Sequence, residues 1–332
     1  MTERVAVQVP CLWHRDLQAE LMTQAADQKL PHALLLSGPA GIGKQRLARA
    51  FLEALLCQKP VAGLACGQCQ SCHLAVAGSH PDIMVLTPEE KSRVIKVDQV
   101  RALVDFFART AQYGGRRVAL VWPAEAMNRN AQNALLKTLE EPGSGALLLL
   151  LSDQPSRLLP TVRSRCQQRQ LAVPDRVQSL PWLTEQTGSE ALSEALLSAA
   201  GGAPLKALAL EQAEWFAERE RLLGQFLAVV EGRVPASIAA QALVKHEPLP
   251  LLEALYGWLA SGLRSAELQD QTLAPMMRRL RAAVGDKRLL ALTEEVLKAR
   301  QWLQSSANPN PTMLFERLLL VLVGVDAMAG VF

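Results

Sequence analysis

The chain has 332 residues, of which 49% are hydrophobic and 5% aromatic, and its 35 basic and 32 acidic side chains give a net charge of +3. Near-balanced charge does not indicate a nucleic-acid surface, and the chain shows neither a secretory signal at its N-terminus nor an apolar run of the roughly 18 residues that cross a bilayer. We therefore expect a cytoplasmic protein with no membrane contact. We also expect two or three domains, because one core rarely grows beyond about 250–300 residues.

The first predicted elements are a helix, a strand and a second helix around a glycine-rich turn. Residues 15–28 have the apolar spacing of an amphipathic helix, 33–36 form a short apolar run typical of a buried strand, and 46–56 again show helical spacing. The turn lies within the sequence LLLSGPAGIGKQ, residues 34–45. This order of elements is the one in which phosphate-binding loops occur.

The turn itself has most of the groups of a phosphate-binding loop. Such a loop uses glycines to wrap backbone N–H groups around a phosphate and a lysine to reach the terminal phosphates, and the chain supplies both: Gly38, Gly41, Gly43 and Lys44. The next residue should carry a hydroxyl for Mg²⁺, but it is Gln45, whose longer neutral amide suits octahedral Mg²⁺ poorly. The loop therefore predicts ATP or phosphate binding with a poor metal site. A chance strand, turn and helix is the alternative.

Four of the six cysteines fall within sixteen residues at the spacing C-x8-C-x2-C-x2-C: Cys57, Cys66, Cys69 and Cys72. They lie in the segment 57–80, which is rich in glycine, cysteine and proline and keeps no helical or strand period. Two overlapping C-x2-C steps turn three thiolates toward one centre, and Gly67 eases the turn between them. Four thiolates complete a closed tetrahedral shell, so the spacing predicts a structural zinc site.

The zinc prediction leaves one alternative for the metal and leaves two histidines and two further cysteines outside the site. An iron–sulfur cluster is the alternative to zinc at the four cysteines. His73 and His80 are substitute ligands by position, but four cysteines already fill the shell. Cys11 and Cys166 stand alone in the sequence, and we expect both to be small buried hydrophobic residues.

Strands and helices alternate after the cysteine segment. The pattern predicts strands at 82–86, 117–122 and 146–151 and helices at 97–110 and 130–141. Strands alternating with helices of ten to fifteen residues indicate a parallel sheet covered on both faces. A ligand then belongs outside the carboxyl ends of the strands, where the glycine loop emerges and where polar Ser152 and Asp153 follow the last strand.

The strand at 117–122 lacks the acidic residues that a nucleotide hydrolase needs next to it. One such acid holds Mg²⁺ and another activates water, but here the strand runs into Trp122-Pro123-Ala124-Glu125. Gln45 already removes the hydroxyl ligand of the metal. Together these departures predict no intrinsic ATPase activity, and an active hydrolase that uses Glu125 as a displaced acid is the alternative.

Two strings carry a resemblance to a known family: NALLKTLEEP at 133–142 and LLPTVRSRC at 158–166. With the glycine loop and the cysteine insertion in the same order, they resemble the clamp-loader ATPase family of bacterial DNA polymerase III. The match is good over 34–169. It implies a subunit of a five-membered ring that opens a sliding clamp and places it on primed DNA, with each ATP site lying between neighbouring subunits.

The resemblance also implies a role for Arg165. Ser164-Arg165-Cys166 matches the family motif that completes the ATP site of a neighbouring subunit, so Arg165 would be an arginine finger acting in trans. A solvated basic edge formed with Arg163 and Arg169 is the alternative. Hydrolysing members have Asp-Glu-Ala-Asp where this chain has Trp-Pro-Ala-Glu, which implies a non-catalytic component of the polymerase III holoenzyme. Its implied partners are motor ATPase subunits of the gamma/tau type, a delta-type subunit, the clamp and, through the complex, primed DNA.

Three domains are expected from this pattern and resemblance. Residues 1–171 form an α/β P-loop NTPase-like (AAA+) domain with a parallel sheet and the zinc module at 57–80. Residues 172–210 resemble the small helical lid of the family, and 211–332 form an all-α helical collar that joins subunits. Lys206, in GGAPLKAL, falls where the family has its second sensor arginine, so it either contacts nucleotide or is solvated.

Two competing functions belong to other classes. One is a self-sufficient AAA+ motor ATPase, which would turn over ATP as an isolated chain. The other is a zinc-dependent nucleic-acid-binding module with a vestigial loop, which would lose DNA binding when zinc is removed, whereas loss of a structural zinc mainly lowers stability.

Overall fold

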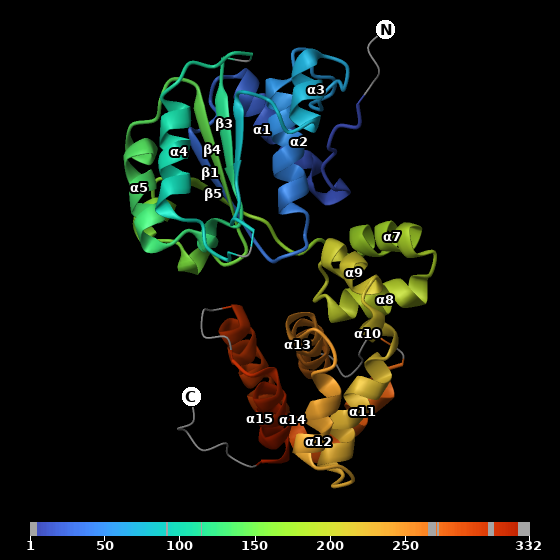
Figure 1. The fold of residues 1–332 in the computed structure, drawn as a ribbon. Helices are drawn as coiled ribbons and strands as arrows, with labels where there is room; N and C mark the ends of the chain where they lie inside the picture. Colours follow the sequence, from blue (N-terminus) through green and yellow to red (C-terminus); the bar gives the residue numbers. More distant parts are fainter. Residues whose placement is uncertain are drawn as a thin grey trace. The chain divides into compact units, whose positions relative to one another are not determined.

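The computed structural model describes residues 5–90, 92–113, 115–264, 270, 272–304 and 309–324. The chain divides into two compact units, Met1–Val173 and Pro174–Phe332 (Figure 1). The first unit contains the sheet and the second is helical. The end of the predicted third domain, residue 332, lies outside the described residues.

The first unit is built on a five-stranded sheet in the order β2-β3-β4-β1-β5, in which every pairing is parallel. The strands are β1 (Ala33–Ser37), β2 (Ile83–Leu86), β3 (Arg117–Val121), β4 (Ala146–Ser152) and β5 (Gln167–Gln170). The predicted α/β fold with a parallel sheet is thus confirmed. The fifth strand was not predicted, because its sequence QQRQ has no apolar run or alternation, and it pairs only with β1 at the sheet edge.

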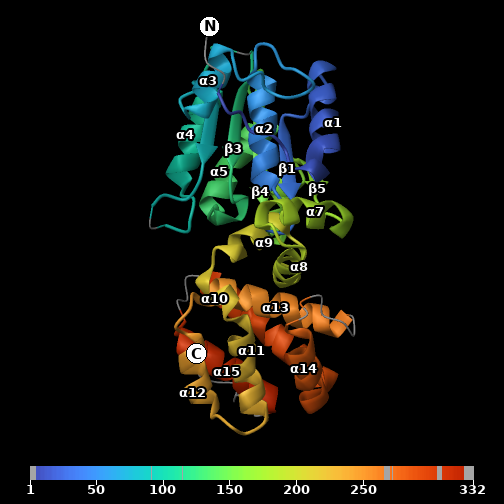
Figure 2. The same cartoon turned by 90° about the vertical axis from the view of Figure 1, so that its right-hand side faces the viewer.

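Helices cover both faces of this sheet. The longer ones are α1 (Arg15–Ala26), α2 (Lys44–Leu56), α4 (Val97–Phe107) and α5 (Arg129–Glu140), with short helices η1 (Leu12–His14), α3 (Gln70–Val76), η2 (Ala124–Ala126), η3 (Pro155–Arg157) and α6 (Pro160–Arg163). The helices α1 and α2 lie on one face of the sheet and α4 and α5 on the other (Figures 1 and 2). The cysteine segment, expected to lack helical periodicity, contains the seven-residue helix α3.

Burial explains why the central strands were easy to predict. Every residue of β1, β3 and β4 is buried, as expected for strands that have helices on both faces. Leu35 faces the α4 and α5 side, where it shares a core with Leu103 and Leu135. Because side chains alternate along a strand, Leu34 and Leu36 face α1 and α2. The glycine loop begins at the carboxyl end of β1, within this buried part of the sheet.

The second unit consists of nine described helices. They are α7 (Arg176–Thr187), α8 (Glu190–Ala199), α9 (Pro204–Glu211), α10 (Glu214–Ala217), α11 (Arg219–Val230), α12 (Ala236–Leu243), α13 (Pro248–Arg264), α14 (Ala274–Gln304) and α15 (Pro311–Val323). The first three pack on one another, and α11, α12, α14 and α15 pack as a bundle. The helix α14 breaks at Gly285, whose φ of 76° is one that glycine adopts readily.

One continuous core joins the helices of the second unit. It extends from Leu183 on α7 to Leu322 on α15. On α13, Gly257 lets the backbone approach α8 closely, since a Cβ there would lie 2.5 Å from the carbonyl oxygen of Ala199. The division of this unit into a lid and a collar near residue 210 stays a prediction. Among the helices in the described part of the chain, none is long and apolar enough to span a bilayer.

Candidate functional site

The glycine loop lies between β1 and α2, at the carboxyl end of the sheet. Gly41 and Gly43 have φ values of 78° and 96°, in the left-handed region that side chains disfavour. Gly38 packs against the backbone after β5, where a Cβ would lie 2.2 Å from the carbonyl oxygen of Leu171. The predicted glycines therefore occupy positions at which the turn needs glycine, and α2 begins directly at Lys44.

Lys44 is buried and its ammonium group is fully engaged within the protein. Only 4% of the side chain is exposed. Its Nζ donates to the carbonyl oxygens of Gly38 at 2.7 Å and Pro39 at 2.6 Å, and it pairs with Asp153 Oδ1 at 2.6 Å. An ammonium has three N–H donors, so these three acceptors account for all of them. The lysine that a nucleotide would use is folded back onto its own loop.

The residues of η1 pack against the same loop. Trp13 Nε1 donates to the carbonyl oxygen of Ile42 at 2.8 Å. His14 is 2% exposed, and neither of its ring nitrogens has a hydrogen-bond partner. Burial, with the charge of Lys44 as the second cause, lowers the pKa of His14 to about 4, so the imidazole is neutral at pH 7.

Gln45 and Glu125 are the two residues that bear on a hydrolytic site, the first after the loop lysine and the second after β3. Gln45 is half-buried in the first turn of α2. Glu125, the displaced acid of the motor hypothesis, lies in η2 and accepts hydrogen bonds from the backbone N–H groups of Asp153 and Gln154 at 3.0 and 3.2 Å. One carboxylate oxygen is therefore used to fix the chain just after β4, and the other is buried without a hydrogen-bond partner.

The four predicted cysteine ligands meet in one cluster. Their Sγ atoms all lie within 4.8 Å of one another, and three of the separations are 3.9, 3.9 and 3.5 Å. Four thiolates around one tetrahedral zinc would stand about 3.8 Å apart, given Zn–S bonds of about 2.3 Å. The cluster thus has the size and ligand number of a closed four-thiolate metal site. Cys57 follows the last residue of α2, and Cys69 and Cys72 come from the start of α3.

Backbone N–H groups surround the sulfur atoms. Lys59 N and Cys66 N point at the sulfur of Cys57, at 3.4 and 3.2 Å. The N–H of Gln68 lies 3.4 Å from the sulfur of Cys66 and is the main cause that lowers the pKa of this thiol to about 6. Burial instead raises the pKa values of Cys57 and Cys72. Cys66 is thus more readily ionised than Cys57 or Cys72 to the thiolate, the form that binds metal.

The two histidines of this segment are not in the cluster. The Nε2 atom of His80 lies 2.9 Å from the hydroxyl of Ser71, which donates to the carbonyl oxygen of Leu56. This network ties the start of α3 to the end of α2. His73 is half-buried and its Nε2 has no hydrogen-bond partner. Cys11 and Cys166 are both buried, as expected for small hydrophobic residues.

Arg165 lies just after α6 on a partly exposed surface. Its Nε donates to Glu140 Oε1 at 2.9 Å, its Nη2 contacts the same oxygen at 2.6 Å, and its Nη1 donates to the carbonyl oxygen of Thr161 at 3.0 Å. The side chain is 36% exposed. A guanidinium has five N–H donors, so these contacts leave donors for a further acceptor. The predicted finger is held in place by Glu140, the last residue of α5.

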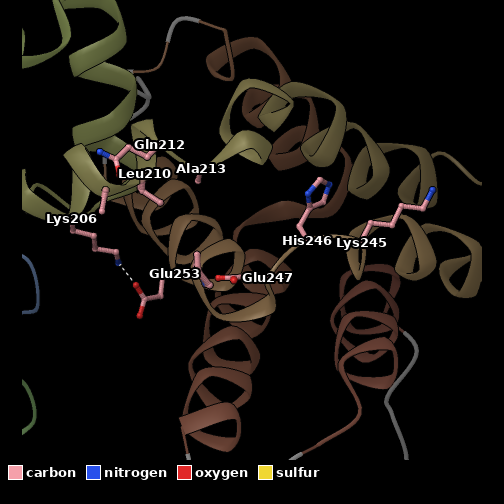
Figure 3. Close-up of a pocket in the computed structure, with 10 residues that line it drawn as sticks. Lys206, Leu210, Gln212, Ala213, Lys245, His246, Glu247 and Glu253 are labelled. Atoms are coloured by element: carbon pink, nitrogen blue, oxygen red, sulfur yellow. Dashed lines mark ion pairs between the residues drawn. The ribbon is translucent and has the colours of Figure 1, made fainter. Parts of the chain in front are cut away.

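Lys206 lies on α9 in the second unit and is paired with a carboxylate. Its Nζ contacts Glu253 Oε2 at 2.7 Å, and Arg300 approaches the other oxygen of Glu253 at 3.6 Å. The two side chains point toward each other at a cavity of about 560 Å³ between α9 and the start of α13 (Figure 3). The lysine is thus neither free nor simply solvated, and its nucleotide role stays a prediction.

The partners of these side chains were not predicted. Asp153 holds Lys44, Glu140 holds Arg165, and Glu253 holds Lys206. For Asp153 a signal existed, because residues that follow neighbouring parallel strands meet at one edge of the sheet. The pairs of Arg165 and Lys206 depend on helix packing, which the local sequence does not specify.

The strand order of the parallel sheet, β2-β3-β4-β1-β5, together with a glycine loop between β1 and α2, defines an AAA+-like P-loop fold. A family model described as DNA polymerase III, delta subunit, matches residues 13–175, and one described as DNA polymerase III, delta subunit, C terminal, matches residues 213–323. DNA polymerase III subunit delta' of Pseudomonas aeruginosa is 43% identical over 318 residues, which are 93% of this chain and 95% of that protein. The subunit delta' of Escherichia coli K12 is 35% identical over 300 residues, or 87% and 88% of the two chains.

The chain therefore belongs to the delta' family of DNA polymerase III subunits, and the resemblance to the clamp-loader family is confirmed. A more distant similarity joins it to DNA polymerase III subunit tau/gamma of Haemophilus influenzae. That protein is 35% identical over 152 residues, which are 46% of this chain and 22% of the relative.

Proposed function

We propose that this chain is a non-hydrolysing subunit of a cytoplasmic clamp loader, which helps to place a sliding clamp on primed DNA during replication. It assembles in a ring with motor ATPase subunits of the gamma/tau type and a delta-type subunit, and it donates Arg165 in trans to the ATP site of a neighbour. Membership of the delta' family supports the role as a subunit of a DNA polymerase III clamp loader. The similarity to a tau/gamma subunit supports motor partners of related fold.

The single observation that carries the non-hydrolysing role is the use made of Glu125. One oxygen of its carboxylate accepts two backbone N–H groups after β4 and so shapes the chain there, whereas a hydrolase needs an acid that is free to hold Mg²⁺ or to activate water. Gln45 replaces the hydroxyl that would hold Mg²⁺. These two departures favour a subunit without turnover over a self-sufficient motor.

The trans role of Arg165 is supported by its setting. The guanidinium is partly exposed, it is oriented by Glu140 and by the carbonyl oxygen of Thr161, and it retains N–H donors. A planar fork of donors that is already oriented suits the equatorial oxygens of a transferring phosphoryl group. A solvated basic edge would need no such orientation.

Zinc is the metal that best fits the cysteine cluster. The four sulfur atoms lie within 4.8 Å of one another, so around one ion they would complete a tetrahedral shell with no position for water, which is the arrangement of a structural zinc site. When bound, the metal would cross-link the segment after α2 to α3 and so hold an insertion with a very small apolar core of its own. The zinc has no part in ATP chemistry in this proposal.

Reconstitution of the ring tests the proposed function. The purified chain, mixed with gamma/tau-type and delta-type subunits, should form a stable complex that loads the clamp on primed DNA, as measured by mass photometry and a fluorescence loading assay. Omission of this chain should abolish loading. A complex that forms and loads the clamp equally well without the chain would contradict the proposal.

A further inference from the structure

The ion pair between Lys44 and Asp153 is short and largely buried on the lysine side. Lys44 is 4% exposed and Asp153 is 32% exposed, so the pair is mostly shielded from water on the lysine side. The Nζ–Oδ1 distance of 2.6 Å is short even for a charged hydrogen bond. In a phosphate-binding loop, the same ammonium contacts phosphate oxygens. The carboxylate of Asp153 therefore makes the contact that a nucleotide phosphate would make.

The sheet brings Asp153 to this place. The strands β1 and β4 are paired in parallel, with Ser37 opposite Ser152. The residues that follow the two strands are consequently neighbours, and Gly38 N donates to the carbonyl oxygen of Ser152 at 3.2 Å. The glycine loop starts on one strand and Asp153 follows the other.

The backbone at Asp153 is fixed independently of Lys44. Glu125 accepts the N–H groups of Asp153 and Gln154, and the hydroxyl of Ser152 accepts the N–H of Gln154 at 3.2 Å. These hydrogen bonds fix the backbone that carries the Asp153 carboxylate, so its position does not depend on the contact with Lys44. Glu125, which a motor would use as an acid, here helps to position the anion that engages Lys44.

We propose that Asp153 is an internal substitute for the nucleotide phosphate, which holds Lys44 and keeps the glycine loop closed in the absence of nucleotide. A nucleotide that enters the loop must break this ion pair and leave the Asp153 carboxylate beside phosphate, where like charges repel. The wild-type chain therefore binds ATP poorly, and Asp153 is the residue that decides this. The inference rests on the proposed function, since a subunit that does not hydrolyse ATP can dispense with binding it.

Calorimetric titration of the full-length chain with MgATP and with ADP tests this proposal. Asp153→Asn keeps the shape of the side chain and removes its charge, and we expect it to bind MgATP at least about tenfold more tightly than wild type. Adding Lys44→Met to Asp153→Asn should return the affinity to the wild-type level, because no ammonium then reaches the phosphates. Asp98→Asn, at a carboxylate that is 80% exposed on α4, is the matched control and should leave binding unchanged.

Two results of the titrations would overturn the inference. One is equal affinity of wild type and a folded Asp153→Asn variant, and the other is a gain in affinity that persists when Lys44 is replaced. If Asp153→Asn fails to fold, Asp153→Ser serves as the second variant. The wild-type chain also provides a test without any substitution, because its melting temperature should not change in about 5 mM MgATP, and a shift of several degrees would show binding and refute the proposal.

Failure of this inference can be told apart from failure of the proposed function. Tight ATP binding by wild type without turnover would overturn the role of Asp153 and leave the non-hydrolysing subunit intact. Turnover by the Asp153→Asn variant would contradict the absence of a hydrolytic site, whereas its gain in binding would still support the role of Asp153.

Discussion

Replacing Arg165 by alanine is expected to lower ATP turnover at the neighbouring subunit's site by about 10³-fold, within the range that arginine fingers contribute. The guanidinium stabilises the charge that develops on the transferring phosphoryl group, and alanine leaves that charge without its donors. The measurement is steady-state ATP hydrolysis by reconstituted rings in which the other ATP sites have been inactivated, so that only the site beside this chain contributes.

Two further variants make this test specific. Arg165→Lys keeps the positive charge but loses the planar fork, so it should restore only a small part of the activity. Arg169→Ala is the matched control, because it removes a nearby arginine that pairs with Glu20 and has no proposed catalytic role. Equal losses for Arg165→Ala and Arg169→Ala would favour the solvated basic edge, and no loss for Arg165→Ala would show that the finger assignment is wrong.

Removal of the metal should have the second largest effect, and it should fall on stability. We expect about one zinc per chain by elemental analysis, and Cys69→Ala should abolish it and lower the free energy of unfolding by about 4 kcal/mol or more. For a unit of this size that loss corresponds to a fall in melting temperature of roughly 8–16 °C. The physical reason is that the segment 58–80 has few buried apolar contacts apart from those around the cysteines.

Cys11→Ala is the control for the metal experiment, because Cys11 is also buried but lies outside the cluster. It should keep the zinc and lose only about 1 kcal/mol of stability. An absorption band near 400 nm with iron in place of zinc would show an iron–sulfur cluster. Full metal content in Cys69→Ala would contradict the ligand assignment, and loss of direct DNA binding with the metal would favour the nucleic-acid-binding module.

The sequence was sufficient where local pattern determines structure. The continuous apolar runs at β1, β3 and β4 are buried on both faces, so burial and composition coincide. The strand β5 escaped prediction because QQRQ is held by pairing with β1 and not by burial of its own side chains. The cysteine spacing predicted a cluster because C-x2-C steps fix geometry over a few residues.

The sequence was insufficient where a side chain depends on a distant partner. Lys44 was expected to be available for phosphate, yet Asp153, more than a hundred residues away, engages it through the register of β1 and β4. Glu125 was considered as an acid, and its use as a backbone acceptor follows from how η2 lies beside the end of β4. Such pairings depend on tertiary packing, which the sequence pattern within one segment does not determine.

The most direct test of the central claim is steady-state ATP hydrolysis by the purified full-length chain alone. The account predicts no turnover above background, because the loop lacks a hydroxyl for Mg²⁺ and Glu125 is engaged by the backbone of Asp153 and Gln154. Robust turnover that Glu125→Gln abolishes would contradict the account and identify the chain as a motor in its own right.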